Sequence, residues 1–174
     1  MALLSGSFCF AQSRQEIDSL KHELAIAKHD TIRVLIMAEL CNQYRNINPD
    51  SGQFYGQQAL TLAQKLKFPR GEVQAFHRLG ATYRIIGDLP KALSLIYNGL
   101  QIAEENRFYN ESVRCLNLLG VLFRDIDDNM KGMSYFQQAL KTNQLVPNSK
   151  EKVANAITIL TNIGSVYQER KQLD

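Results

Sequence analysis

The stretch AFHRLGATY at residues 75–83 decides the fold, because it recurs twice further along the chain. The copies CLNLLGVLF at 115–123 and ILTNIGSVY at 159–167 keep the same order: a bulky apolar residue, two residues, an apolar residue, glycine, two residues and an aromatic ring. A degenerate copy, MAELCNQY at 37–44, places Cys41 in the glycine position. Self-similarity at a nearly fixed period predicts a repeat architecture.

A second type of segment, in which small residues recur, accompanies three of these copies. It reads GQFYGQQAL at 52–60, ALSLIYNGL at 92–100 and GMSYFQQAL at 132–140. Two antiparallel helices need small residues where their backbones approach closely, and large residues fill the volume between them. The sequence therefore predicts successive pairs of helices.

This pattern resembles the tetratricopeptide repeat (TPR) family, whose first helix carries a bulky residue, Leu-Gly and an aromatic. The resemblance implies an all-α, TPR-like α-α superhelical solenoid of about eight antiparallel helices. The glycine positions 41, 80, 120 and 164 are separated by 39, 40 and 44 residues. Longer helices account for this excess over the usual repeat of about 34 residues. The chain departs from the family pattern at Cys41 and lacks both Trp and a proline that ends the second helices.

Turn signals and apolar periodicity set the expected domain limits. We expect residues 1–12 to be the remnant of a signal peptide and 13–174 to form one TPR array. Ile17, Leu20, Leu24 and Ala27 recur at helical spacing, which predicts a capping helix at 14–28. The repeats are expected at about 31–68, 70–107 and 110–146, with a truncated fourth at 149–174.

Both ends of the chain carry further expectations. The first residues end in Phe-Ala before Gln12, as in a secretory signal peptide, and the alternative is an apolar leader that frays. The fourth repeat stops where its second helix should begin, so we expect the polypeptide to continue. Its apolar face, with Leu160, Ile163 and Tyr167, is then exposed in these residues and offers a surface for a homodimer.

Composition excludes several other classes of protein. The 174 residues are 45% hydrophobic and 21% charged, and no run of apolar residues is long enough for a membrane span. A net charge of +3, with Lys and Arg dispersed along the repeats, does not predict nucleic-acid binding. His22, His29 and His77 lack metal-ligand spacing, and the glycines lie mainly in repeat positions and turns. We therefore expect no enzyme activity, cofactor or metal site. We expect Cys41 and Cys115 to be buried thiols that form no disulfide.

Candidate binding residues lie on the first helices, which line the concave surface in the TPR family. A stripe of arginines there suits carboxylates or an acidic helix. The alternative is that these arginines are solvated helix formers paired with nearby aspartates. The residues after the aromatic positions are Arg45, Arg84, Arg124 and Gln168, a second groove position holds His77, Asn117 and Thr161, and further candidates are Asn42 and Arg114.

The chaperone-tail binders of the family hold a C-terminal carboxylate with Lys and Asn at set positions. Asn42 matches one of these positions, whereas Ala38, Arg78 and Leu118 stand where other clamp residues should be. Binding of a chaperone tail is therefore not expected. The expected partner is instead a protein or peptide ligand with acidic character.

Two functions remain open. The leader, followed by DTIRVL at 30–35 and Asn-Pro-Asp at 48–50, resembles the N-terminal TPR region of membrane sensor histidine kinases from the Bacteroidetes. This resemblance implies a non-catalytic, extracytoplasmic (periplasmic) sensory or scaffolding region of a two-component signalling protein of the histidine kinase type. In that family the repeats precede a transmembrane helix and either a kinase module or a DNA-binding output domain. The alternative is a free-standing, cytoplasmic TPR adaptor that binds an acidic peptide or helix in its groove.

Overall fold

The computed structural model describes the backbone of residues 3–171 and the side chains of residues 14–168. Over these residues the chain is all-α, with eight helices and no strand, as predicted. The helices are α1 (Leu3–Ile26), α2 (Asp30–Tyr44), α3 (Pro49–Lys65), α4 (Pro69–Ile86), α5 (Leu89–Glu105), α6 (Tyr109–Asp125), α7 (Asn129–Asn143) and α8 (Lys150–Lys171).

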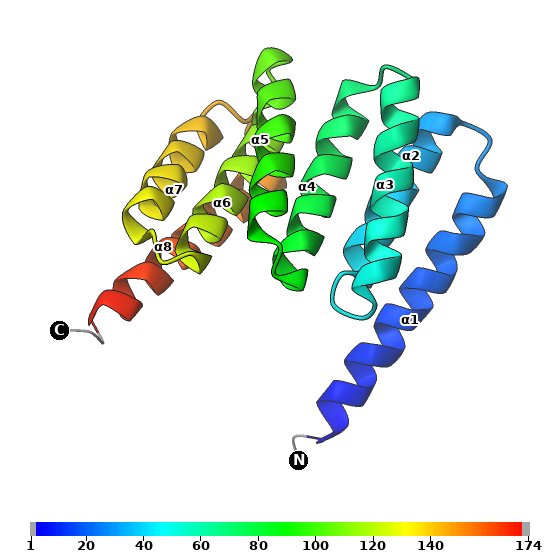
Figure 1. Cartoon of the computed structure of the whole chain (residues 1–174), viewed down its shortest axis with the longest axis horizontal. Coiled ribbons are helices and arrows are strands. Elements are labelled where there is room, and N and C mark those ends of the chain that lie inside the picture. Colours follow the sequence, from blue (N-terminus) through cyan, green and yellow to red (C-terminus); the bar gives the residue numbers. More distant parts are fainter. Residues whose placement is uncertain (1–2, 172–174) are drawn as a thin grey trace. The chain divides into compact units, whose positions relative to one another are not determined.

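The helices form two compact units, Met1–Asp88 with α1 to α4 and Leu89–Asp174 with α5 to α8 (Figure 1). In the first unit α3 packs against both α2 and α4, these two helices also touch, and α1 packs on α2. In the second unit α7 packs against both α6 and α8, and α5 packs on α6. Each unit thus holds a second helix of a repeat against the first helices on either side of it.

Turn chemistry ends and starts these helices. The Asn48 side chain caps α3 by accepting a hydrogen bond from the backbone N–H of Ser51 at 3.1 Å, and Pro49 occupies the first turn of α3. Asp128 caps α7 in the same way, with the backbone N–H of Lys131 at 3.0 Å. Gly87 ends α4 at φ 92°, a left-handed conformation that glycine adopts without steric cost.

Helix α1 packs on the first repeat through the stripe that the sequence singles out. Its buried Ile17 forms a cluster with Ile36 and Leu40 of α2, and Leu20, Leu24 and Ala27 pack against that cluster. The backbone of α1 is already helical from Leu3, so it includes most of the expected signal-peptide remnant, whose Met1 and Ala2 lie outside the described residues.

Size complementarity between paired helices explains the departure at Cys41. In the second unit Gly120 of α6 faces the ring of Phe136 in α7, and a Cβ added there would lie 2.4 Å from the ring. The first repeat reverses this order, because a Cβ added at Gly56 of α3 would lie 2.8 Å from the Cys41 sulfur. In the first repeat the larger residue, Cys41, is on the first helix and the glycine, Gly56, is on the second. In the third repeat the glycine, Gly120, is on the first helix and the larger residue, Phe136, is on the second.

Both cysteines that the structure describes with side chains, Cys41 and Cys115, are free and buried. Burial raises the pKa of Cys41, and it raises the pKa of Cys115 to about 12. Both thiols are therefore neutral at physiological pH. Within the described part of the chain no helix is long and apolar enough to cross a membrane.

Candidate protein-binding surfaces

Glu39 organises the face shared by α2 and α4 in the first unit. Its Oε1 accepts hydrogen bonds from the side-chain amides of Asn42 at 2.9 Å and Gln43 at 3.2 Å. Its Oε2 pairs with Nη2 of Arg78 on α4, also at 2.9 Å. The predicted groove residue Asn42 therefore lies on this face with its amide nitrogen already engaged.

Arg45 and Arg84 bring two positive charges to the end of the same pair of helices. Arg45 is the C-cap of α2, and Arg84 lies in the last turn of α4. The Arg45 Nε is buried and has no hydrogen-bond partner among the described residues. Burial lowers the pKa of Arg45, and the charge of Arg84 lowers it further. The Arg45 guanidinium is therefore partly desolvated and lies within the field of a second cation.

The remaining members of the predicted groove set are divided between the two units. His77 is half-buried on α4 in the first unit. In the second unit, Arg124 is half-buried in the last turn of α6 and Gln168 is exposed on α8. The predicted alignment of Arg45, Arg84, Arg124 and Gln168 along one surface stays a prediction.

Asparagines connect α6 and α8 in the second unit. Asn162 donates a hydrogen bond from Nδ2 to Oδ1 of Asn117 at 2.9 Å. Two helical turns earlier, Asn155 donates to Oδ1 of Asn110 at 2.7 Å. The predicted residue Asn117 is thus part of the contact between two helices, and its side-chain oxygen is occupied.

Two other predicted residues of this unit are exposed. The hydroxyl of Thr161 donates to the backbone carbonyl of Ile157 at 2.8 Å, within α8 itself. Arg114 lies on α6, and its positive charge interacts with the carboxylate of Glu151 on α8. The pKa of Glu151 is lowered mainly by hydrogen bonds from its own backbone N–H and from Ser149, and Arg114 contributes less.

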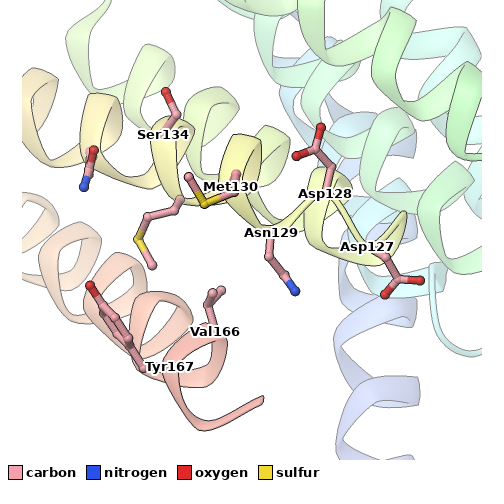
Figure 2. Close-up of a pocket in the computed structure, with 9 residues that line it drawn as sticks. Asp127, Asp128, Asn129, Met130, Ser134, Val166 and Tyr167 are labelled. Carbon is pink, nitrogen blue, oxygen red and sulfur yellow. The ribbon is translucent and has the colours of Figure 1, made fainter. Parts of the chain in front are cut away.

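A pocket of about 600 Å³ opens between α7 and α8. Figure 2 shows Val166 and Tyr167 of α8 across an open space from Met130 of α7. Asp127 and Asp128, from the turn before α7, also line the pocket. It therefore combines apolar walls with an acidic end. Sequence reasoning missed this pocket, although it had singled out the α8 face beside it.

Sequence reasoning also missed the pairing of Glu39 with Arg78. The two residues are 39 positions apart, which is the spacing of the first two repeats, so they occupy equivalent positions. Opposite charges at equivalent positions of consecutive first helices are the signal that would have found the pair.

Comparisons with known proteins place the chain among TPR proteins. The family model described as the SusR N-terminal TPR domain matches residues 7–99. No curated protein matches the chain.

Three solved structures share the fold. BtubC (BKLC) from P. vanneervenii is 18% identical with a TM-score of 0.68, and the match covers 92% of this chain and 65% of that one. The TPR domain of Arabidopsis FLU is 19% identical with a TM-score of 0.58, covering 68% of this chain and 100% of that one. A Rap protein complexed with Competence and Sporulation Factor is 17% identical with a TM-score of 0.76, covering 97% of this chain and 48% of that one. These likenesses confirm the predicted TPR-like fold.

Proposed function

Because the chain belongs to the family of SusR N-terminal TPR domains, we propose that this protein-interaction module is the sensory or scaffolding region of a larger signal-transduction protein. The family is defined by an N-terminal domain, which supports a larger parent protein. The parent is of the two-component sensor histidine kinase type, and the module lies on the extracytoplasmic side of the membrane. The module itself is non-catalytic and acts by binding another protein.

Its ligand is an acidic peptide segment bound by Arg45 and Arg84. The observation that carries this proposal is the half-buried Arg45 guanidinium. Its Nε has no hydrogen-bond partner within the described residues, and the positive charge of Arg84 lowers the pKa of Arg45. A carboxylate would satisfy the buried donor and reduce the repulsion between the two cations, and arginine binds carboxylates through two parallel hydrogen bonds.

Glu39 acts on Arg45 through its charge, but its carboxylate is hydrogen-bonded to other residues. Both of its carboxylate oxygens already accept hydrogen bonds, Oε1 from Asn42 and Gln43 and Oε2 from Arg78. The Glu39–Arg78 pair therefore holds α2 against α4, and none of the hydrogen bonds that Glu39 makes among the described residues reaches Arg45. This arrangement supports selection of a negatively charged ligand over a neutral one.

A labelled, glutamate-rich peptide tests the ligand assignment by fluorescence anisotropy. Arg45→Ala and Arg84→Ala should each weaken binding by about tenfold to a hundredfold, because a hydrogen bond to a charged group contributes roughly 1.5–3 kcal/mol. Arg14→Ala is the matched control, since Arg14 is exposed on α1 in the same unit and should leave affinity unchanged. Equal affinities for all four proteins would refute the arginine site.

The signalling context has a separate test. Reading the coding sequence past Asp174 should find further repeats, an apolar span of about 20 residues and a kinase module. A stop codon after one more helix would instead favour the free-standing adaptor. Fractionation of cells that produce the tagged, full-length protein should place the module outside the cytoplasm, and recovery in the cytosol would contradict the proposal.

A further inference from the structure

Tyr97 of α5 and Tyr135 of α7 meet through their hydroxyl groups in the second unit. The two phenolic oxygens are 2.8 Å apart and share a hydrogen bond. The ring centroids are 6.5 Å apart, and the ring planes are inclined by 65°. Because the oxygens are much closer together than the ring centres, the rings meet at the edges that carry the hydroxyl groups. The ortho carbons, which are the ring carbons next to the hydroxyl-bearing carbon, lie on these same edges.

The ring of Tyr135 is held in place from the side of α6. It stacks on Phe123 with ring centroids 5.3 Å apart and an angle of 13° between the planes. Phe123 is buried, and Nζ of Lys131 lies over its ring at 4.1 Å from the centroid. Stacking on a buried ring restrains the orientation of an aromatic side chain. The edge of Tyr135 that faces Tyr97 is therefore fixed.

Tyr97 is the accessible member of the pair, since its side chain is 39% exposed. Partial burial and the hydrogen bond with Tyr135 raise the pKa of Tyr97, so its phenol is neutral at physiological pH. A one-electron oxidant that reaches Tyr97 removes an electron and the phenolic proton together and leaves a neutral radical. The hydrogen bond gives the hydrogen atom of Tyr135 a path to the Tyr97 oxygen, which restores Tyr97 for a second oxidation.

From this geometry we propose that Tyr97 and Tyr135 form an oxidative modification site, at which a haem peroxidase with hydrogen peroxide joins the two rings as dityrosine. Each phenol loses one electron and one proton, and the two radicals combine in a new bond between ortho carbons. The hydrogen on each ortho carbon then moves to the adjacent oxygen, which restores both phenols. One hydrogen peroxide molecule accepts the two electrons and two protons and becomes two water molecules.

The arrangement before the reaction already resembles that of the product. In an ortho-coupled pair of phenols the hydroxyl groups flank the new bond and can hydrogen-bond to each other, and the two ring planes are twisted. Tyr97 and Tyr135 show both features, the hydrogen bond of 2.8 Å and the inclination of 65°. Coupling then requires only that the two edges approach, which rotation about the side-chain bonds of the exposed Tyr97 can provide.

Tyr44 and Tyr55 in the first unit offer a comparison within the same chain. Their ring centroids are closer, at 5.7 Å, but their planes are inclined by only 5°. The rings are therefore stacked face over face, and their ortho carbons do not meet edge to edge. Proximity alone would favour coupling of Tyr44 with Tyr55, whereas the proposed edge geometry favours Tyr97 with Tyr135.

The cross-link would join the second helices of two consecutive repeats. Both α5 and α7 pack on α6, so a bond between them would restrain the three helices as one body. The joined residues are 38 positions apart in the sequence. Closing a loop of this length lowers the conformational entropy of the unfolded chain, as a disulfide does. The oxidised protein is therefore expected to be more resistant to unfolding.

The test treats the 174-residue chain, at low concentration, with a haem peroxidase and hydrogen peroxide. We expect a monomeric product that is lighter by two hydrogen atoms and shows dityrosine fluorescence. Tryptic digestion should join the peptide 92–107 to the peptide 132–141, each of which contains a single tyrosine. The purified product should have a urea midpoint higher by about 1 M or more.

Three variants complete the test. Tyr97→Phe and Tyr135→Phe each keep the ring but remove the hydroxyl, and each should abolish the joined peptides. Tyr44→Phe is the matched control and should leave their yield unchanged. Coupling of the peptide 34–45 to 46–65 in equal or higher yield would overturn the proposal, because proximity and not edge geometry would then decide. Products that are only intermolecular, the absence of dityrosine, or an unchanged urea midpoint of the purified product would also overturn it.

Discussion

The same substitution at two equivalent glycines should have opposite effects on stability. Gly120→Ala places a methyl group 2.4, 2.5 and 2.9 Å from three carbons of the Phe136 ring. Phe136 is fully buried, so its ring cannot move aside without disturbing the contact between α6 and α7. Gly164→Ala places the same methyl group where no described atom lies within 4 Å.

The magnitudes follow from two competing terms. Replacing glycine by alanine inside a helix gains about 0.5–1 kcal/mol, because it lowers the conformational entropy of the unfolded chain. Overpacking a well-filled core costs about 1–3 kcal/mol. Gly164→Ala should therefore stabilise the protein by about 0.5–1 kcal/mol, and Gly120→Ala should destabilise it by about 0.5–2 kcal/mol.

Urea unfolding followed by far-UV circular dichroism measures both changes. With a slope of about 1–3 kcal/mol per molar urea, a change of 1 kcal/mol moves the midpoint by roughly 0.3–1 M. Phe136→Leu in the Gly120→Ala background should recover part of the loss, because the smaller side chain makes room for the methyl group. Shifts of the same sign for the two single variants, or no recovery in the double variant, would refute the packing argument.

Three further variants test other parts of the structure. Phe136→Ala should lower the unfolding free energy by about 3–5 kcal/mol, measured with the same urea titration, and a loss below about 1 kcal/mol would contradict full burial of the ring. Gly87→Ala should cost about 1–2 kcal/mol because Gly87 has a φ of 92°, and an unchanged midpoint would argue against the left-handed turn. The pKa of Cys115 is raised from 9.0 to about 12, so its contribution to stability is complete below pH 9 and is lost as the pH rises toward 12. The difference in stability between the wild type and Cys115→Ala should therefore shrink over this pH range, and a difference that grows would exclude the neutral buried thiol.

Helix pairing was predictable because the repeat positions have a simple physical meaning. Gly120 and Phe136 must meet once two antiparallel helices pack at close range. The exchange in the first repeat was not predicted, although Cys41 and Gly56 were both visible in the sequence. Recognising it requires knowing which residue of the second helix faces the glycine position of the first.

Polar contacts between first helices were predicted less well. Alignment of the repeats puts Asn117 and Thr161 in one column, yet the structure pairs Asn117 with Asn162. The partner is displaced by one residue because helix packing, which alignment of the repeats does not fix, sets the relative rotation of neighbouring helices. Glu39 and Arg78, in contrast, pair at the spacing of the repeat itself.

Binding at the arginine site and packing of the helices respond to different physical forces, which gives a way to separate them. Binding of an acidic peptide at Arg45 and Arg84 depends on charge at a half-exposed site, so its affinity should fall as salt screens the interaction. Packing of the repeat helices depends mainly on apolar burial, as at the fully buried Phe136, and added salt does not weaken it. Salt that releases the acidic peptide while leaving the urea midpoint of the free protein unchanged would therefore show that charge at the arginine site, and not unfolding, sets the loss of affinity.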